Sequence, residues 1–472
     1  MSFVTRRKSI DTITEQDAHQ RLKPTLSWPH LVAMGVGAIV GTGIYTLTGI
    51  GAGLAGPGVL LSFLFCGILC GCAALCYAEM ATMMPAAGSA YTYSYAVLGE
   101  LLAWIVGWSL ILEYTVAAAA VAVGWSAHVG EFMLAAHWHV PAQFLHGIEA
   151  GGWLDVPAIG ISLVVTALLI VGTRESASVN LVLVAIKLAA LVLFVVLAAR
   201  SFDPARFHPL LPYGLFAHVG PDGTKRGVLA AAALIFFAFY GFDAVSTAAE
   251  ETRNPARDLT IGIVGSMLLC TFIYIAVAAS ALGAAYYIDI ARTGAPLVYI
   301  LRELHHPLAS ELVAAAAIVA LPTVILVLMY GQSRIFFVMA RDGLLPRGLA
   351  AVHKTRGTPA LMTSLTGLVV VALAATLKLD QIALLANAGT LCAFIAVALC
   401  TLILRLREPE RTRAFRVPLV WLVAPLCIAG CVYLFANGLP AFTQWWFVIW
   451  NGIGLAVYLL YGVRRSRLAG AG

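Results

Sequence analysis

The chain has 472 residues, of which 61% are hydrophobic and 11% are charged, and its formal net charge is +6. Soluble globular domains carry about 25% charged residues, and a water-soluble fold of this size cannot bury so much apolar surface. The composition therefore excludes a soluble globular domain, a disordered chain, a coiled coil and a secreted disulfide scaffold. It predicts an all-α polytopic membrane protein whose solvent is lipid.

The first residues and the cysteines fit this class. Residues 1–27 are polar and lack the basic-then-apolar pattern of a cleaved signal peptide. Every cysteine falls inside an apolar run, so no disulfide framework is expected. The cysteines are Cys66, Cys70, Cys72, Cys76, Cys270, Cys392, Cys400, Cys427 and Cys431.

Twelve apolar runs predict membrane-spanning helices, each of which needs about 20 residues to cross the hydrocarbon core. The run at 156–172 is the shortest, so the count carries an error of one. The runs cover residues 28–55, 57–83, 98–127, 156–172, 179–199, 228–249, 259–283, 309–340, 359–376, 381–404, 417–437 and 443–463.

Lys and Arg residues are unevenly distributed between these runs. With the N-terminus in the cytoplasm, 21 of the 29 fall in inner segments, seven fall in outer loops, and Lys187 lies within a run. Positive residues stay on the cytoplasmic side of a membrane, so both termini are expected in the cytoplasm and the chain in the cytoplasmic (inner) membrane. The positive charge then flanks the inner leaflet and implies no nucleic-acid partner. No GxxxxGK[ST] motif for ATP occurs.

The first run, LVAMGVGAIVGTGIYTLTGIGAG, holds glycines at 35, 37, 41 and 43 in mid-span. Each glycine inside a helix costs about 0.5–1 kcal/mol relative to alanine. The cluster therefore indicates either backbone that is not helical or a small-xxx-small packing face from Gly37 to Gly41.

The sixth run, LAAALIFFAFYGFDAVSTAAEE, is interrupted by Gly241 and then by Asp243. A carboxylate inside a membrane span is expensive and is a functional candidate by default. The alternative is a structural carboxylate beside a partner or a wet cavity.

The two unusual runs lie five apart in the order of spans, which is the pattern of two inverted five-helix repeats with broken helices in corresponding positions. At such breaks, free N–H groups at the start of one half-helix can bind a carboxylate, and free carbonyls at the end of the other can bind an ammonium. Backbone groups therefore suffice to recognise the zwitterion of an α-amino acid.

Four segments carry a resemblance to a known family: GVGAIVGTGIYTLTG, YAEMATMMPAAGSAYTYSYAVLGE, FAFYGFDAVSTAAEETRNPARDLTIGI and GQSRIFFVMARDGLLP. They resemble the amino acid–polyamine–organocation superfamily, and within it the bacterial branch of the cationic amino acid transporter family. The resemblance runs from about residue 25 to 465. It implies a leucine-transporter-type fold of five-plus-five inverted repeats with two added C-terminal helices, and secondary uptake of amino acids that is usually proton-coupled.

The resemblance also implies roles for residues at the two breaks. The substrate carboxylate would meet backbone N–H groups of Thr42 and Gly43, with Gly41 also in the substrate site, and Phe242 would form an aromatic gate above the substrate. The α-ammonium would meet carbonyls near Ile39, Phe237, Ala238 and Tyr240. Two departures from the family pattern are Tyr240, where aliphatic residues are common, and Thr260, where proline is frequent.

Lys187 is the polar exception in the fifth run, VNLVLVAIKLAALVLFVVL. A charged lysine at the bilayer centre costs about 2.5–3.5 kcal/mol on insertion scales. It lies about 12 Å from the inner end of the helix, at about 1.5 Å per residue, so its amine either snorkels to the interface or projects into the bundle. Proton-coupled relatives carry a lysine here, so the resemblance implies that Lys187 binds the coupling proton beside Gly37–Val40.

Two further carboxylates lie in apolar runs. Glu113 either lines the inner route or makes structural hydrogen bonds, and Glu79, near the inner end of the second run, is expected to have a structural role at the interface.

The predicted organisation has a cytoplasmic tail (1–27), a first repeat (28–199), an outer loop (200–227), a second repeat (228–404), two added helices (405–463) and a cytoplasmic tail (464–472). The predicted function is proton-coupled amino acid transport, with neutral or broad specificity favoured and arginine or lysine as the alternative. A membrane enzyme would need a polar catalytic cluster that the sequence lacks, and a channel fits two mid-span breaks less well. We expect an amino acid, a proton and lipid as partners, and no cofactor, metal or obligatory protein partner.

Overall fold

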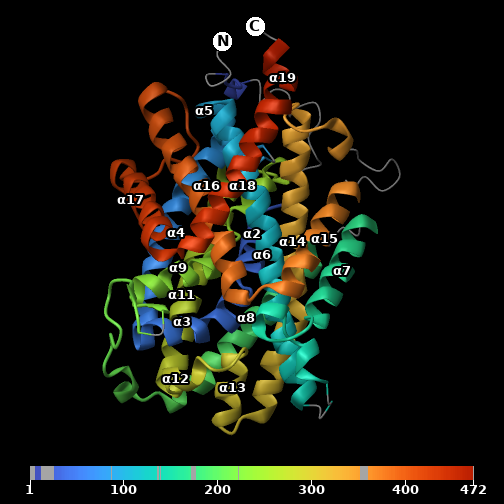
Figure 1. The fold of residues 1–472 in the computed structure, drawn as a ribbon. Helices are drawn as coiled ribbons and strands as arrows, with labels where there is room; N and C mark the ends of the chain where they lie inside the picture. Colours follow the sequence, from blue (N-terminus) through green and yellow to red (C-terminus); the bar gives the residue numbers. More distant parts are fainter. Residues whose placement is uncertain are drawn as a thin grey trace.

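The computed structural model describes residues 6–11, 26–86, 88–135, 138, 140–171, 177–221, 223–350 and 360–470. Most of the predicted tail 1–27 therefore lies outside the described residues. The helices form one bundle, and residues 6–11 lie at the same end of it as α19 (Val463–Arg465) (Figure 1). We call this the terminal end. The opposite end, which carries α12 (Tyr287–Ile290) and α13 (Pro296–Glu303), is the loop end.

The helices of the first half begin with a broken segment. α2 is followed by a π-helical turn and α3, and a glycine with φ of 63° at position 56 separates α3 from α4. The bounds are α2 (Trp28–Ile39), η1 (Gly43–Leu47), α3 (Thr48–Ala55), α4 (Val59–Met83), α5 (Ser89–Val97), α6 (Glu100–Ala135), α7 (Val156–Val171) and α8 (Ala177–Ala198).

The second half begins with another broken segment. The bounds are α9 (Val228–Ile235), η7 (Phe236–Phe239), α10 (Ala244–Thr247), η8 (Ala249–Glu251), α11 (Pro255–Ala284), α14 (Pro307–Arg341), α15 (Ala360–Thr376), α16 (Leu379–Arg407), α17 (Val420–Tyr433), η10 (Leu434–Gly438), α18 (Ala441–Val457) and η11 (Tyr458–Gly462). A short antiparallel hairpin, β1 (His218–Val219) with β2 (Lys225–Arg226), precedes α9.

Nine helical stretches of the described chain are long and apolar enough to span a membrane, and α2, α7 and α15 are shorter apolar helices. One of the nine, Gly43–Met83, joins the second part of the first predicted span to the whole of the next. The prediction of a polytopic helical membrane protein is confirmed at this level.

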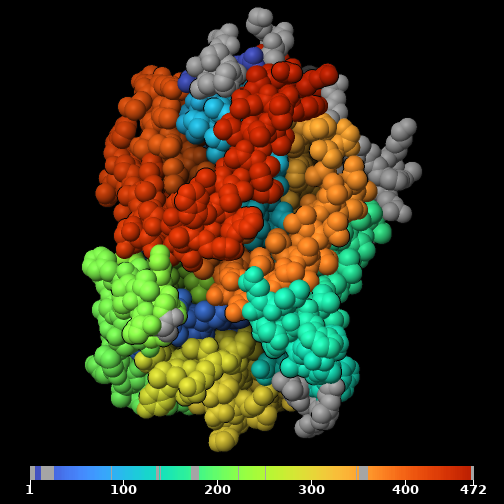
Figure 2. Space-filling model, in the orientation of Figure 1, coloured from blue at the N-terminus to red at the C-terminus, as the bar shows by residue number. Residues whose placement is uncertain are grey.

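The centre of the bundle is α6, which packs against α14 and α16, while α4 and α2 pack against α11. The outer face of α6 is covered by α18, drawn in red in Figure 2. Indole N–H groups fasten this contact: Trp104 donates to the Gly454 carbonyl at 2.8 Å, and Trp108 and Trp450 each donate to the other's carbonyl at 2.9 Å. The central helices therefore form a packed scaffold around the two broken segments.

Candidate functional site

The first break falls between α2 and η1. α2 ends at Ile39, Val40 is extended (φ −72°, ψ 90°), and the helix resumes at Thr42 and Gly43. Backbone N–H groups in the first turn of a helix have no intrahelical acceptor, and the last carbonyls of a helix have no intrahelical donor. The break therefore places free donors of one half-helix next to free acceptors of the other.

The second break falls between η7 and α10. Tyr240 is extended (φ −65°, ψ 145°) and Gly241 has φ of 109°, a backbone conformation that favours glycine. Asp243 precedes α10 directly. The interruptions expected within 37–44 and 236–243 are both present.

The two breaks touch each other through glycine. A Cβ atom on Gly43 would lie 2.3 Å from the Cα atom of Ala238, and one on Gly241 would lie 2.9 Å from the Cβ atom of Ala38. At each break, the glycine therefore packs against an alanine that lies two residues before the extended residue of the other break. No larger side chain fits at Gly43 or Gly241, so the two backbones approach each other closely there.

Lys187 projects from α8 into this region and is fully buried. Its Nζ atom donates to the Gly37 carbonyl at 2.9 Å and to Thr323 Oγ1 on α14 at 3.2 Å. Snorkelling to the interface, the alternative considered above, is excluded in this conformation. The amine instead joins the end of α2 to the scaffold.

Two tyrosines complete the contacts around the first break. The Tyr274 hydroxyl on α11 donates to the Ile39 carbonyl at 2.7 Å, and the Tyr45 hydroxyl on η1 donates to the Lys187 carbonyl at 3.3 Å. The sequence analysis did not identify Tyr274, Tyr45 or Thr323. Each is an ordinary polar residue in a span, and only its three-dimensional position distinguishes it.

Two buried carboxylates, Asp243 and Glu113, lie beside the second break. Asp243 Oδ2 accepts from the Tyr114 hydroxyl at 2.7 Å. Among the described residues, Asp243 Oδ1, both Glu113 carboxylate oxygens and the Tyr240 hydroxyl have no hydrogen bond of ordinary geometry. Carboxyl groups buried inside a membrane protein are functional candidates, so this pair beside the second break is a candidate for binding a proton or a cation.

Aromatic side chains shape the surroundings of the second break. The Tyr240 ring stacks parallel to Phe237, with centroids 6.0 Å apart, and meets Tyr114 edge-on. The ring of Phe242 packs against Tyr77 and Phe394 at 5.7 and 5.1 Å. In this conformation Phe242 thus belongs to an aromatic cluster with α4 and α16, and its role as a gate stays a prediction.

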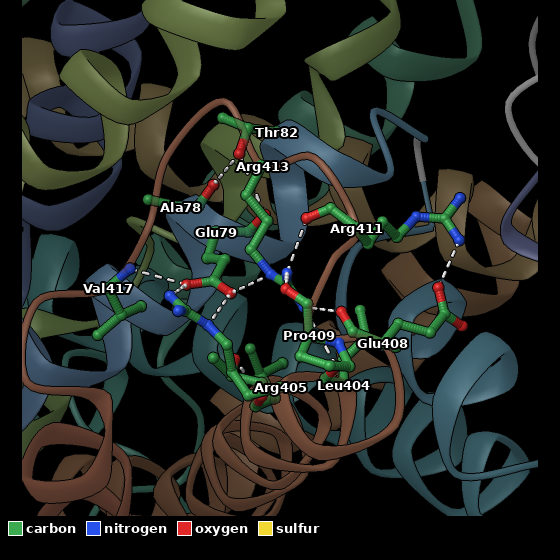
Figure 3. Close-up of polar contacts among 12 residues, drawn as sticks. Ala78, Glu79, Thr82, Leu404, Arg405, Glu408, Pro409, Arg411, Arg413 and Val417 are labelled. Carbon is green, nitrogen blue, oxygen red and sulfur yellow. Dashed lines mark hydrogen bonds and ion pairs between the residues drawn. The ribbon is translucent and has the colours of Figure 1, made fainter.

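Glu79 lies in a separate charge cluster at the terminal end (Figure 3). Its Oε1 atom accepts from Arg405 Nε at 2.9 Å and Arg413 Nε at 3.0 Å. Its Oε2 atom accepts from Arg405 Nη2 and the Val417 N–H, both at 2.7 Å. A buried carboxylate with four donors fits the structural role expected for Glu79. No group of three or more His, Cys, Asp or Glu side chains within the described ranges could hold a metal ion.

Known proteins match this chain over nearly its whole length. The profile of the amino acid permease family matches residues 26–459. The branched-chain amino acid permease BcaP of Bacillus subtilis is 40% identical over 470 residues, which cover 98% of this chain and 99% of that protein. The methylthioribose transporter of the same bacterium is 38% identical over 471 residues, with coverages of 99% and 100%.

A plant protein extends the comparison. The vacuolar cationic amino acid transporter 2 of Arabidopsis thaliana is 38% identical over 413 residues, which cover 86% of this chain and 64% of that protein. The chain therefore belongs to the amino acid permease family, within the amino acid–polyamine–organocation superfamily.

Proposed function

We propose that this permease carries an amino acid zwitterion across the membrane by alternating access, and that a proton bound at Lys187 drives uptake. The observation that carries the proposal is the hydrogen bond from the Lys187 amine to the Gly37 carbonyl at the end of α2. The substrate leaves the protein chemically unchanged, which separates this function from that of an enzyme.

The substrate site would be the pair of breaks. N–H groups of Gly41, Thr42 and Gly43 receive the carboxylate, since they start a half-helix whose dipole favours an anion. The carbonyls of Ile39, Phe237, Ala238 and Tyr240 receive the ammonium. The Ile39 and Phe237 carbonyls already accept from Tyr274 and from the Tyr240 N–H, but a carbonyl has a second lone pair for the substrate.

The coupling step follows from the chemistry of the lysine. A charged ammonium makes hydrogen bonds about twice as strong as those of a neutral donor, so protonated Lys187 holds the end of α2 firmly against α8 and α14. When the proton leaves, these bonds weaken and α2 is free to move. Proton loading at Lys187 would thus decide whether the first broken segment can rearrange around the substrate.

The proposed architecture is twelve membrane helices in two inverted five-helix repeats, plus α17 and α18 with the turns that follow them. The reciprocal contacts of Gly43 with Ala238 and of Gly241 with Ala38 support it, because a pseudo-two-fold axis between two repeats predicts such exchange. The terminal end would face the cytoplasm, with the chain in the inner membrane, because most Lys and Arg residues lie in connections at that end.

Neutral amino acids are the favoured substrates, in keeping with the similarity to branched-chain amino acid permeases. One observation supports arginine or lysine as a second candidate. The buried carboxyl groups of Glu113 and Asp243 lie close enough to interact with each other beside Tyr240, next to the break that would hold the ammonium. An acidic pocket at that position would accept a cationic R group.

Reconstituted vesicles with an imposed pH gradient test the coupling. Lys187→Met should lose uptake driven by the gradient while it keeps the melting temperature of a folded protein. Lys378→Met is the matched control, because Lys378 is exposed at the start of α16. Unchanged gradient-driven uptake in Lys187→Met would refute the coupling role.

Competition measures the substrate range. Uptake is measured with alanine, leucine, arginine and lysine as competitors at two external pH values. Competition by leucine but not arginine supports the neutral class. Competition by arginine that is lost in Glu113→Gln supports the cationic class. Recovery of the label in a chemically altered form would overturn transport as the function.

A further inference from the structure

The loop between α16 and α17 has a fixed shape because it is built around Arg413. The Nε atom of Arg413 donates to Glu79 at 3.0 Å. Its two terminal nitrogens donate to main-chain carbonyls at the end of α16 and in the loop, those of Leu404, Glu408, Pro409 and Arg411. These bonds use all five N–H groups of the guanidinium, so Arg413 holds the loop and keeps no donor for a ligand.

A cavity of about 620 Å³ opens beside this loop. Ligand cavities in proteins measure about 300–1,000 Å³, so a polar group of moderate size fits inside it. Its lining comprises Asp11, Thr82 and Met83 at the end of α4, and Arg411, Thr412, Arg413 and Ala414 of the loop. These residues belong to the terminal end of the bundle and not to the two breaks.

Arg411 is the accessible cation of this cavity, whereas the Arg413 side chain is 0% exposed. The Arg411 side chain is 24% exposed and points away from Glu79 (Figure 3). It forms ion pairs with Glu408 at 2.7 Å and with Asp11 at 2.6 Å, whose side chains are 43% and 75% exposed. Exposed ion pairs stabilise a fold only weakly, so another anion can readily take the place of Asp11.

Asp11 also shows which chemistry Arg411 binds at this place, because its carboxylate is an oxyanion held by the guanidinium. The N–H groups of a guanidinium form a fixed fork that matches phosphate as well as carboxylate. Thr412, the next residue of the lining, is exposed and carries a hydroxyl that can donate to a second oxygen. The cavity therefore suits an anion with two free oxygens, such as a phosphate diester.

Exposed apolar side chains place the loop at the level of the membrane surface. Leu406, just before the loop, and Leu419, at its end, are 68% and 75% exposed, and Trp421 on α17 is 60% exposed. In a membrane permease such side chains face lipid, and tryptophan favours the level of the lipid headgroups. Residues 405–419 carry five arginines and two glutamates, and a positive excess beside a membrane helix attracts anionic lipids.

We propose that this cavity binds the phosphate group of an anionic phospholipid, with Arg411 and Thr412 as its donors. Asp11 is then an internal competitor, which occupies Arg411 when the lipid is absent. A free phosphate ion carries similar oxygens, but only a lipid has acyl chains that can pack on Leu406 and Leu419. The proposal requires the terminal end to lie at a membrane surface. It is independent of the transported substrate, of proton coupling and of the side that this end faces.

Thermal unfolding of the full-length protein in an uncharged detergent measures this binding, because a ligand of the folded state raises the melting temperature. The probes are phosphatidylglycerol, phosphatidylcholine and inorganic phosphate, each added in increasing amounts at high salt, which screens long-range attraction. Phosphatidylglycerol should raise the melting temperature to a plateau. Phosphatidylcholine, whose choline cation opposes Arg411, and inorganic phosphate should leave it unchanged.

Four variants locate the binding. Arg411→Gln should raise the half-saturating amount of phosphatidylglycerol roughly tenfold, because it removes charge-assisted hydrogen bonds. Thr412→Val removes a neutral donor and should raise that amount about threefold. Asp11→Asn removes the competitor and should lower it about threefold. Arg416→Gln is the matched control, because Arg416 is exposed on the same loop but outside the cavity lining, and it should bind like the parent.

Absence of a saturable rise with phosphatidylglycerol overturns the proposal. An equal rise with phosphatidylcholine means a general lipid effect, and an equal rise with inorganic phosphate means a site for a free ion, so either result overturns it as well. Equal losses of affinity in Arg411→Gln and Arg416→Gln exclude the cavity as the site. Should Arg411→Gln fail to fold, the opposite shifts expected for Thr412→Val and Asp11→Asn decide the question. Binding is read without an amino acid, so a failure of uptake would refute the proposed function alone.

Discussion

Replacing Glu79 by glutamine tests the charge cluster at the terminal end (Figure 3). Each carboxylate oxygen of Glu79 accepts two hydrogen bonds, so all four donors point at acceptor atoms. A glutamine presents one acceptor and one NH₂ group. In either orientation of the amide, the NH₂ group faces two N–H donors, and the guanidinium groups of Arg405 and Arg413 lose their carboxylate.

The magnitude follows from burial. Glu79 is 0% exposed and the Arg413 side chain is also buried, so the pair is not screened by water. Removing one partner of a buried ion pair costs about 3–5 kcal/mol. Glu408 provides the matched control, because its carboxylate pairs with Arg411 in the same loop but is 43% exposed. An exposed pair of this kind contributes about 0–1 kcal/mol.

Thermal unfolding in detergent checks this prediction. An unfolding entropy of about 2.1 cal/mol/K per residue over 472 residues makes 1 kcal/mol worth roughly 1 °C. Glu79→Gln should therefore melt about 3–5 °C below the wild type, and Glu408→Gln within about 1 °C of it. A Glu79→Gln protein that melts together with Glu408→Gln would refute the assignment of the cluster as a structural lock.

Two further changes test the break and a loop carboxylate. Gly43→Ala should abolish amino acid binding, because its methyl group would collide with Ala238. Binding is measured by uptake and by ligand-induced thermal stabilisation. The control variant Gly71→Ala has open space around its methyl group, so it should keep amino acid binding and gain about 0.4–1 kcal/mol of stability. Asp155 precedes α7 and accepts a hydrogen bond from the Ser126 hydroxyl. Burial raises the pKa of the Asp155 carboxyl group to about 6. The stability that Asp155 contributes is therefore present below about pH 4 and is lost as the pH rises through 6. Asp155→Asn should therefore melt progressively higher than the wild type between pH 5 and 7 in a thermal-shift titration, and a constant difference would contradict the pKa shift.

The interruptions of the two broken segments could be predicted because their causes are local. Glycines in mid-span and a carboxylate two residues after Gly241 are unfavourable for a lipid-exposed helix whatever surrounds them. The first predicted span, 28–55, ends where the structure ends α3, because Gly56 takes a positive φ there. A structural feature whose cause lies in a few consecutive residues can be predicted from the sequence alone.

The partners across the bundle could not be predicted in the same way. Thr323 reaches Lys187 from a helix 136 residues further along the chain, and Arg405 reaches Glu79 across 326 residues. These contacts between helices depend on how each helix is rotated about its own axis. In nearly uniformly apolar spans, no polar face reveals that rotation. The proximity of Glu113 to Asp243 was missed for the same reason.

The contact between Gly43 and Ala238 has a consequence for how substrate preference can change. The space at Gly43 accommodates a hydrogen atom but not a methyl group, so a larger side chain cannot be introduced at that contact. Substitutions can act instead at side chains around the breaks, such as Tyr240 or Val324. The Val324 side chain would lie 3.6 Å from a Cβ atom placed on Gly41. Under the proposed function, substrate preference can therefore change through these peripheral side chains while the peptide groups proposed to bind the amino acid's carboxylate and ammonium stay the same.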